Sequence, residues 1–367
     1  MTSALVFERV GIRCLRNLTA LDIEPSTRLN VVSGDNGQGK TSLLEALYLV
    51  ATSKSFRAEK LRELVQQGAE SAVVRANLRE AGDLREQRAV VSERGRSFLL
   101  DGKRPPALAS YATRTPVVVF HPGDLALVSG AAAMRRTLLD RVGLFVDPMS
   151  ADDRQRYLHA LRERQHILEE RGLAASELDA FEPIIAQHGA RWAAAHAASA
   201  DRLAEALRRG FERLAPAGLR LDVRFEPAST DDAERFLAEL VARRGRDRAR
   251  GSASFGPQRD ELALDVDGRS ARRHASQGQQ RILTLSLKLA ELECVRQARG
   301  AHPVLLLDDV SSELDPLRTG AVYEFLRTTD SQVFVTTTRR DLFPTPDLGA
   351  AERRDFVLRD GVLQDLD

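Results

Sequence analysis

The stretch NVVSGDNGQGKTSLLEAL, residues 30–47, joins an apolar run, a glycine-rich segment and a helix-like pattern. Within it, Gly34-x-x-x-x-Gly39-Lys40-Thr41 matches the phosphate-binding loop that connects a strand to a helix. Glycines let backbone N–H groups turn inward around a phosphate at the helix N-terminus, where they form an anion-binding nest. We therefore interpret the loop as a nucleotide site in preference to an ordinary glycine-rich turn.

The loop pattern assigns specific roles to its polar side chains. Lys40 is expected to reach the β- and γ-phosphates, and Thr41 to place its hydroxyl on Mg²⁺. ATP and Mg²⁺ are therefore the expected cofactors, and Lys40 is a predicted catalytic residue. The predicted nucleotide-binding residues of the loop are Gly34, Asp35, Asn36, Gly37, Gln38, Gly39, Lys40 and Thr41.

The second half of such a site is an apolar strand that ends in a carboxylate, and PVLLLDD, residues 303–309, supplies it. Its continuous apolar run is typical of a strand buried on both faces. Asp308 is expected to hold Mg²⁺ through water. Asp309 follows it, where a carboxylate orients or deprotonates an attacking water, so it is the second predicted catalytic residue. Buried strands often end in acidic residues, and the loop at residues 34–41 is what makes this segment specific.

A third segment, HASQGQQRILTLSLKLAELE, begins at His274 and continues as an amphipathic helix pattern. One interpretation is a capped helix, because Ser276 and Gln279 fit a capping box. The other is a γ-phosphate site, because a serine hydroxyl and free N–H groups at a helix N-terminus bind anions. Its position about 30 residues before LLLDD favours the second interpretation, with Ser276, Gly278 and Gln279 as nucleotide-binding residues.

Composition limits the possible partners and compartments. The 367 residues carry 54 Lys and Arg against 53 Asp and Glu, a net charge of +1, so any nucleic-acid surface is a local patch. One candidate is RRGRDRAR, residues 243–250, for which a solvated linker is the alternative interpretation. Two cysteines demand no disulfide, and no signal peptide or run of about 18 apolar residues is visible. We expect a cytoplasmic protein without a membrane span.

The pattern along the chain changes twice. Residues 1–125 and 251–367 read as mixed strands and helices, whereas residues 126–250 read as helical by apolar spacing and Ala, Leu, Arg and Glu content. The simplest organisation is one α/β domain (lobe I) that is split by a mainly α-helical insertion (lobe II).

The loop, the S-x-G-Q segment and LLLDD together resemble the ABC-type ATPase heads, including the SMC family. This resemblance implies an α/β P-loop head, a mixed sheet with flanking helices, interrupted by the helical lobe. It also implies that the S-x-G-Q segment of one subunit caps ATP held by another, and that residues 311–315 (SSELD) cross the dimer interface. Transporter heads usually have a His after the next strand, where this sequence has Thr336, Thr337 and Thr338, so the γ-phosphate sensor is unassigned.

Lys40 and Asp308 are 268 positions apart, more than a transporter head needs and far fewer than a long coiled coil requires. A globular insertion of this size resembles the RecF family of bacterial recombinational repair. GIRCLRNL, FHPGDLALVSGAAAMRRTLLD (120–140), FGPQRDEL (255–262) and LLLDDVSSELD carry the resemblance over most of the chain. The sequence departs from the family pattern at Leu15, at Gln258 and in RERQH, residues 162–166.

The RecF resemblance implies a weak, DNA-dependent ATPase that acts as a switch and dimerises with ATP. It implies binding to double-stranded DNA near single-strand gaps, and help in loading RecA together with RecR and RecO. The alternatives are the nucleotide-binding subunit of a membrane transporter and a mainly architectural SMC-like protein. Arg135 and Arg136 allow two interpretations, as salt-bridge residues or as contacts to DNA or ATP.

Overall fold

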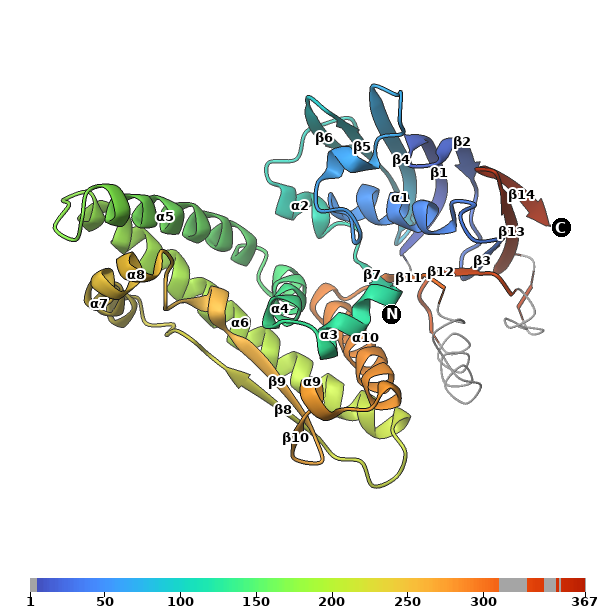
Figure 1. Cartoon of the computed structure of the whole chain (residues 1–367). Helices are drawn as coiled ribbons and strands as arrows, with labels where there is room; N and C mark the ends of the chain where they lie inside the picture. Colours follow the sequence, from blue (N-terminus) through green and yellow to red (C-terminus); the bar gives the residue numbers. More distant parts are fainter. Residues whose placement is uncertain (1–4, 310–328, 340–347, 350, 367) are drawn as a thin grey trace. The chain divides into compact units, whose positions relative to one another are not determined.

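The computed structural model describes residues 5–309, 329–339, 348–349 and 351–366 (Figure 1). By internal contacts the chain divides into two compact units, residues 1–124 with 295–367 and residues 125–294. The boundary between residues 124 and 125 lies next to the predicted one at 125. The second boundary, after residue 294, lies well beyond residue 251, where the sequence predicts that lobe I resumes. Residues 311–315, predicted to cross a dimer interface, lie outside the described residues.

The first unit contains a six-stranded sheet that positions the loop. Its strands are parallel to their neighbours except β14, which pairs antiparallel with β13. Four of its strands are buried along their whole length, as continuous apolar runs predict. The strand order is β14 (Val362–Leu366), β13 (Arg353–Arg359), β3 (Leu29–Ser33), β12 (Val333–Thr337), β11 (Val304–Leu307) and β7 (Val117–Phe120).

A second, antiparallel sheet of five strands completes the first unit. Its order is β2 (Leu18–Ile23), β1 (Leu5–Leu15), β4 (Ser71–Glu80), β5 (Asp83–Ser92) and β6 (Gly95–Leu100). Helix α1 (Lys40–Thr52) is buried on nearly all sides and shares one apolar core with both sheets, against which it lies in Figure 1. Most of its residues are apolar, as a helix buried in this way requires, and the buried Glu45 is paired with Arg16. The short elements of this unit are η1 (Leu61–Leu64) and α2 (Leu108–Ala112).

The second unit is mainly helical, as predicted for this part of the chain. Helix α6 (Leu178–Leu214) is 37 residues long and packs against α5 (Figure 1). The other helices are η2 (Pro122–Leu125, at the junction of the units), α3 (Ala126–Ser129), α4 (Ala132–Val146), α5 (Ser150–Glu170), α7 (Ala233–Ala242), α8 (Arg244–Arg250), η3 (Pro257–Arg259), α9 (Ala271–His274) and α10 (Gln277–Arg299). No helix in the described part of the chain is long and apolar enough to cross a membrane.

Residues 251–294 join the second unit because of long-range packing. Strand β9 (Glu261–Val266) pairs with β8 (Leu221–Glu226) and with β10 (Arg269–Ser270) in a three-stranded sheet. Leu283 and Leu287 of α10 lie in the same apolar core as Leu207 of α6. The contacts therefore group this segment with the helices, although its sequence pattern is that of mixed α/β structure.

Candidate functional site

The loop between β3 and α1 has the backbone that its glycines predict. Gly34 and Gly39 have φ values of 152° and 109°, a region that residues with a side chain rarely adopt. Gly39 is the N-cap of α1, and a Cβ atom there would lie 2.8 Å from Leu18 Cδ2. The loop thus ends at the N-terminus of a buried helix, where backbone N–H groups favour an anion.

The side chain of Lys40 turns back over this loop. Its Nζ donates to the carbonyl oxygens of Gly34 at 2.6 Å and Asp35 at 2.8 Å. Burial lowers the pKa of Lys40, and the nearby Asp309, Asp308 and Asp35 oppose that change. A cation held here at the mouth of an anion-binding loop is suited to neutralising phosphate charge.

The two predicted Mg²⁺ ligands come together although 267 positions separate them. Thr41 Oγ1 donates to Asp308 Oδ1 at 3.0 Å, because β3 and β11 end at the same edge of the sheet. Burial raises the pKa of Asp308, and hydrogen bonds from Thr336 and Thr41 work against that rise. A hydroxyl and a carboxylate oxygen fit Mg²⁺, which takes one or two protein oxygens and completes its shell with phosphate and water.

Asp309 sits beside Asp308 in a constrained backbone conformation. Its φ of 48° is unusual for a residue with a side chain, and such conformations cost on the order of 1–3 kcal/mol. Its backbone N–H donates to Thr336 Oγ1 at 3.0 Å, and the same hydroxyl donates to Asp308 Oδ1 at 2.8 Å. Thr336 therefore contacts the carboxylate of Asp308 and the backbone of Asp309, a role that sequence reasoning missed when it treated this residue only as a missing His.

Asn17 is a second residue that the sequence did not single out. Its Nδ2 donates to the carbonyl oxygen of Gly37 at 2.9 Å, and its Oδ1 accepts from Ser42 Oγ at 2.8 Å. On the other side of the loop, Gln38 Oε1 accepts from the backbone N–H of Asp360. Two turns, one after β1 and one after β13, therefore hold the loop in place.

The S-x-G-Q segment forms the predicted capping box at the start of α10, in the second unit. The backbone N–H of Ser276 donates to Gln279 Oε1 at 2.8 Å, and that of Gln279 donates to Ser276 Oγ at 3.2 Å. Ser276 is exposed and Gly278 half-buried. The capped-helix interpretation is therefore confirmed, and the predicted role toward a γ-phosphate stays a prediction. In contrast, Lys40, Thr41, Asp308 and Asp309 all lie in the first unit.

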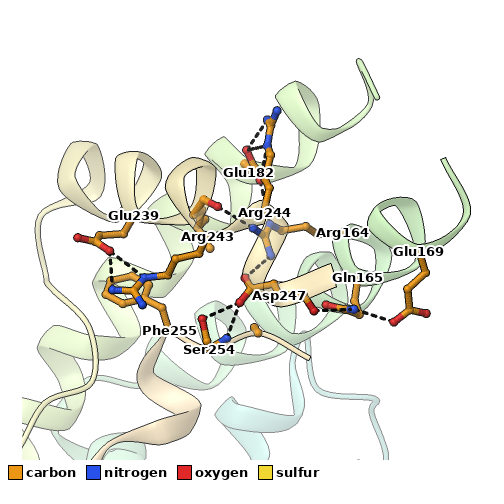
Figure 2. A network of polar contacts seen from close by, with 12 residues as sticks. Arg164, Gln165, Glu169, Glu182, Glu239, Arg243, Arg244, Asp247, Ser254 and Phe255 are labelled. Carbon is orange, nitrogen blue, oxygen red and sulfur yellow. Dashed lines mark hydrogen bonds and ion pairs between the residues drawn. The ribbon is translucent and has the colours of Figure 1, made fainter. Parts of the chain in front are cut away.

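The arginine-rich run at 243–250 is not an open linker. Most of it forms α8, and its buried Asp247 accepts from Arg164 NH1 at 2.8 Å and from Ser254 Oγ at 2.7 Å (Figure 2). Arg244 NH2 and Arg164 Nε both donate to Glu182, at 2.6 Å and 2.9 Å. The run therefore anchors α8 to α5 and α6.

The remaining side chains of this run divide into two groups. Arg243 lies over the ring of Phe255 at 5.2 Å and pairs with Glu239, so it is also part of the packing (Figure 2). The exposed group consists of Arg246, Arg248 and Arg250. Three of the five arginines of this run therefore remain as candidate DNA contacts.

Arg135 and Arg136 have structural partners. Arg135 is buried and makes a two-bond ion pair with Glu261, at 2.7 and 2.9 Å. Arg136 donates to the carbonyl oxygen of Asp260 at 2.9 Å. Both contacts join α4 to the start of β9, so the salt-bridge interpretation describes Arg135 well.

The three departures from the family pattern have structural roles. Leu15 is fully buried in the core of the first unit. Gln258 accepts from the hydroxyl of Tyr157 at 2.6 Å. In RERQH, Arg164 is the fully buried arginine that binds Asp247 and Glu182.

The chain resembles known proteins over most of its length. Residues 6–348 match the sequence family described as RecF/RecN/SMC N terminal domain. A DNA replication and repair protein RecF from Anaeromyxobacter sp. (strain Fw109-5) is 39% identical, over 91% of this chain and 92% of the relative. The chain belongs to the RecF family. The RecF of Myxococcus xanthus (strain DK1622) is also 39% identical, over 88% of each chain.

Solved structures confirm the predicted fold class. A recombination mediator protein RecF-ATPrS in the RecFOR pathway matches with a TM-score of 0.88 at 25% identity, covering 99% of both chains. The corresponding RecF-ATP structure matches with a TM-score of 0.87 at 26% identity, covering 99% of this chain and 98% of that one. A Smc head domain from Pyrococcus furiosus, at 17% identity and a TM-score of 0.55, covers 99% of this chain and 96% of that one and shows the shared fold alone. RecF membership favours DNA repair over the transporter alternative.

Proposed function

We propose that this chain binds ATP with Mg²⁺ between the loop at residues 34–41 and the carboxylates Asp308 and Asp309. The observation that carries the proposal is the 3.0 Å hydrogen bond from Thr41 Oγ1 to Asp308 Oδ1, which joins the two Mg²⁺-binding oxygens. Mg²⁺ would screen the phosphate charge there. The similar solved structures are named for RecF-ATP and RecF-ATPrS, which supports the choice of nucleotide.

ATP then joins two copies of the chain. The exposed Ser276 at the N-terminus of α10 supplies a hydroxyl and backbone N–H groups, which suit the γ-phosphate of ATP held by the other copy. Lys40 binds the phosphates, and Asp309 accepts a proton from the attacking water. Asp is one methylene shorter than Glu, so it holds water less directly, and we expect slow, DNA-dependent hydrolysis that releases the dimer.

The dimer binds duplex DNA near single-strand gaps and helps to load RecA, together with RecR and RecO. Two findings support this role. The chain belongs to the RecF family, and the name of the similar solved structure places that protein in the RecFOR pathway. In this role ATP hydrolysis resets a switch, and a low turnover rate is sufficient.

The test is the molar mass of the protein by light scattering, with and without ATP and Mg²⁺, in parallel with duplex retention on a filter. Wild type should shift from monomer to dimer with ATP and retain gapped duplex. Lys40→Met should remain monomeric under both conditions. Equal monomer fractions for both proteins with ATP would refute ATP-driven dimerisation, and wild type that retains no duplex would refute the DNA-binding role.

A further inference from the structure

The outer face of the antiparallel sheet in the first unit carries a hollow of about 500 Å³. Its opposite face supplies the apolar core that contacts α1, so this face is the one turned away from that helix. Four of its eight lining residues are arginines, against a single acidic residue. The lining residues are Arg9, Gly11, Arg13, Asp22, Val73, Arg75, Asn77 and Arg88.

A β-bulge in β1 brings two of these arginines onto one face. The pairing of β1 with β4 shifts between Phe7 and Arg9, so that Arg9, Gly11 and Arg13 alternate with buried residues. Bulges of this kind redirect side chains. Arg9 and Arg13 are four residue steps apart along the strand, a span of about 13 Å. The two guanidinium groups can therefore reach different phosphates.

Gly11 forms the floor of the hollow between the arginines. It is not among the residues with a left-handed backbone, so a larger residue would meet no backbone strain there. A Cβ atom at this position would lie 2.9 Å from Asp22 Oδ1, the end of a movable side chain. The effect of glycine here is to leave space above the sheet.

The arginines repel one another and have weak local partners. Arg75 lies directly opposite Arg88 in the pairing of β4 with β5, an arrangement of like charges that is unfavourable in a sheet. The side chain of Arg88 makes no ion pair with any residue that the structure describes. Arg75 pairs with Glu86, and Arg13 with Asp22 at 2.7 Å, but these arginines are exposed, so a phosphate can compete for them.

We propose that this hollow binds the sugar-phosphate backbone of duplex DNA. Arginine presents a planar fork of donors that matches phosphate oxygens. The lining contains no aromatic side chain on which an unpaired base could stack, which favours the backbone of a duplex over single-stranded DNA. The inference rests on the proposed DNA-binding function and assigns it a surface.

The test measures duplex affinity of the full chain with ATP and Mg²⁺ at several salt concentrations, for wild type and for the double variant Arg75→Ala/Arg88→Ala. Each lost phosphate contact lowers the slope of log K against log salt by about 0.9, so we expect a decrease of about 1.8 and weaker binding by about tenfold or more. Gly11→Glu is a second variant, because it places a carboxylate among the arginines. It should weaken duplex binding, and its melting temperature is compared with that of wild type to confirm that the sheet still folds, because Gly11 lies opposite Asp22.

Arg94→Ala/Arg96→Ala is the matched control, since it removes two exposed arginines of the β5–β6 hairpin, outside the hollow. Its slope of log K against log salt should remain closer to the wild-type slope than that of Arg75→Ala/Arg88→Ala does. Wild type that binds duplex, together with an unchanged slope in the hollow variants, would overturn this inference and leave the proposed function standing. Wild type that binds no duplex would overturn both. Single-stranded DNA and polyglutamate serve as comparison ligands. Hollow variants that no longer bind one of these but still bind duplex DNA would show that the hollow serves another partner, contrary to the proposal.

Discussion

Thr336 donates its hydroxyl to Asp308 Oδ1 at 2.8 Å, and the two residues come from neighbouring parallel strands. The same hydroxyl accepts a hydrogen bond from the backbone N–H of Asp309, so one side chain contacts both acidic residues of the site. A hydrogen bond to a charged group contributes about 1.5–3 kcal/mol. We infer that this threonine fixes the direction of the Asp308 carboxylate, which we propose binds Mg²⁺.

Thr336→Val should weaken Mg²⁺ binding while preserving the shape of the strand. Burial raises the pKa of Asp308, and the Thr336 hydroxyl opposes that rise, so the variant makes Asp308 harder to ionise. The Mg²⁺ concentration for half-maximal ATP turnover should rise about tenfold, as expected for a lost hydrogen bond to a carboxylate. Because Mg²⁺ needs the ionised form, the increase should be larger at pH 6 than at pH 8. The exposed Thr338→Val is the control, and an equal Mg²⁺ dependence in the two variants would contradict this role.

Ser276→Asp separates helix capping from nucleotide capping. Aspartate is as good an N-cap as serine, so α10 should keep its capping box and its stability. Its charge should repel a γ-phosphate presented by a second copy. We expect ATP affinity at the loop to be unchanged while ATP-induced dimerisation is lost, measured by nucleotide titration and light scattering. An ATP-dependent dimer that survives this substitution would show that the hydroxyl does not face a phosphate.

Much of the site was predictable because its signals are local. The loop from Gly34 to Thr41 is a contiguous pattern, and LLLDD is a buried strand that ends in carboxylates. Thr336 was not predictable in this way, because its role depends on the pairing of β12 with β11, which no short pattern records. The capping box at Ser276 was predictable from spacing alone, and its hydrogen bonds confirm it.

The fold was predicted best where periodicity is strong and worst where distant segments pack. The long helices of the second unit follow from apolar spacing. The highly charged run 243–250 allows a DNA contact or a solvated linker from sequence alone. In the structure, Arg164 of α5, 83 positions away, binds its buried Asp247. Similarly, β8 and β9 pair across the predicted boundary near residue 250, and this pairing draws residues 251–294 into the helical unit.

His196 should make the second unit sensitive to alkaline pH. Burial lowers the pKa of this histidine, but hydrogen bonds and charge from Asp140 and Asp260 outweigh it, so the pKa lies above its usual value of 6.5. Its ring nitrogens lie 3.1 Å from Asp140 Oδ1 and 2.9 Å from Asp260 Oδ2. Arg154 and Trp192 also contact Asp140; the arginine stays positively charged and the indole stays neutral over the pH range in which His196 titrates.

A group with a raised pKa in the folded state stabilises the protein fully below its unfolded pKa, and this stabilisation is lost as pH rises through the folded pKa. The melting temperature of wild type should therefore fall as the pH rises from 6.5 through the folded-state pKa of His196. His196→Gln should have a lower melting temperature at pH 6.5 and a flatter profile above it. His274→Gln, at an exposed position, is the control. Parallel profiles of melting temperature against pH for wild type and His196→Gln would contradict the stabilising role that we assign to His196.

Asp247→Asn should destabilise the second unit without changing the surface charge pattern of α8. Asp247 and Arg164 are both fully buried, so the variant leaves a buried guanidinium with one charged partner fewer. Removing one partner of a buried ion pair costs about 3–5 kcal/mol, and we expect the low end because Glu182 still binds Arg164.

Urea unfolding can be followed by the fluorescence of Trp192, the single tryptophan, which lies in the core of this unit. Arg246→Ala, on the same helix but exposed, should change the stability by less than about 0.5 kcal/mol. Equal unfolding midpoints for the two variants would show that the buried pair does not hold α8 in place.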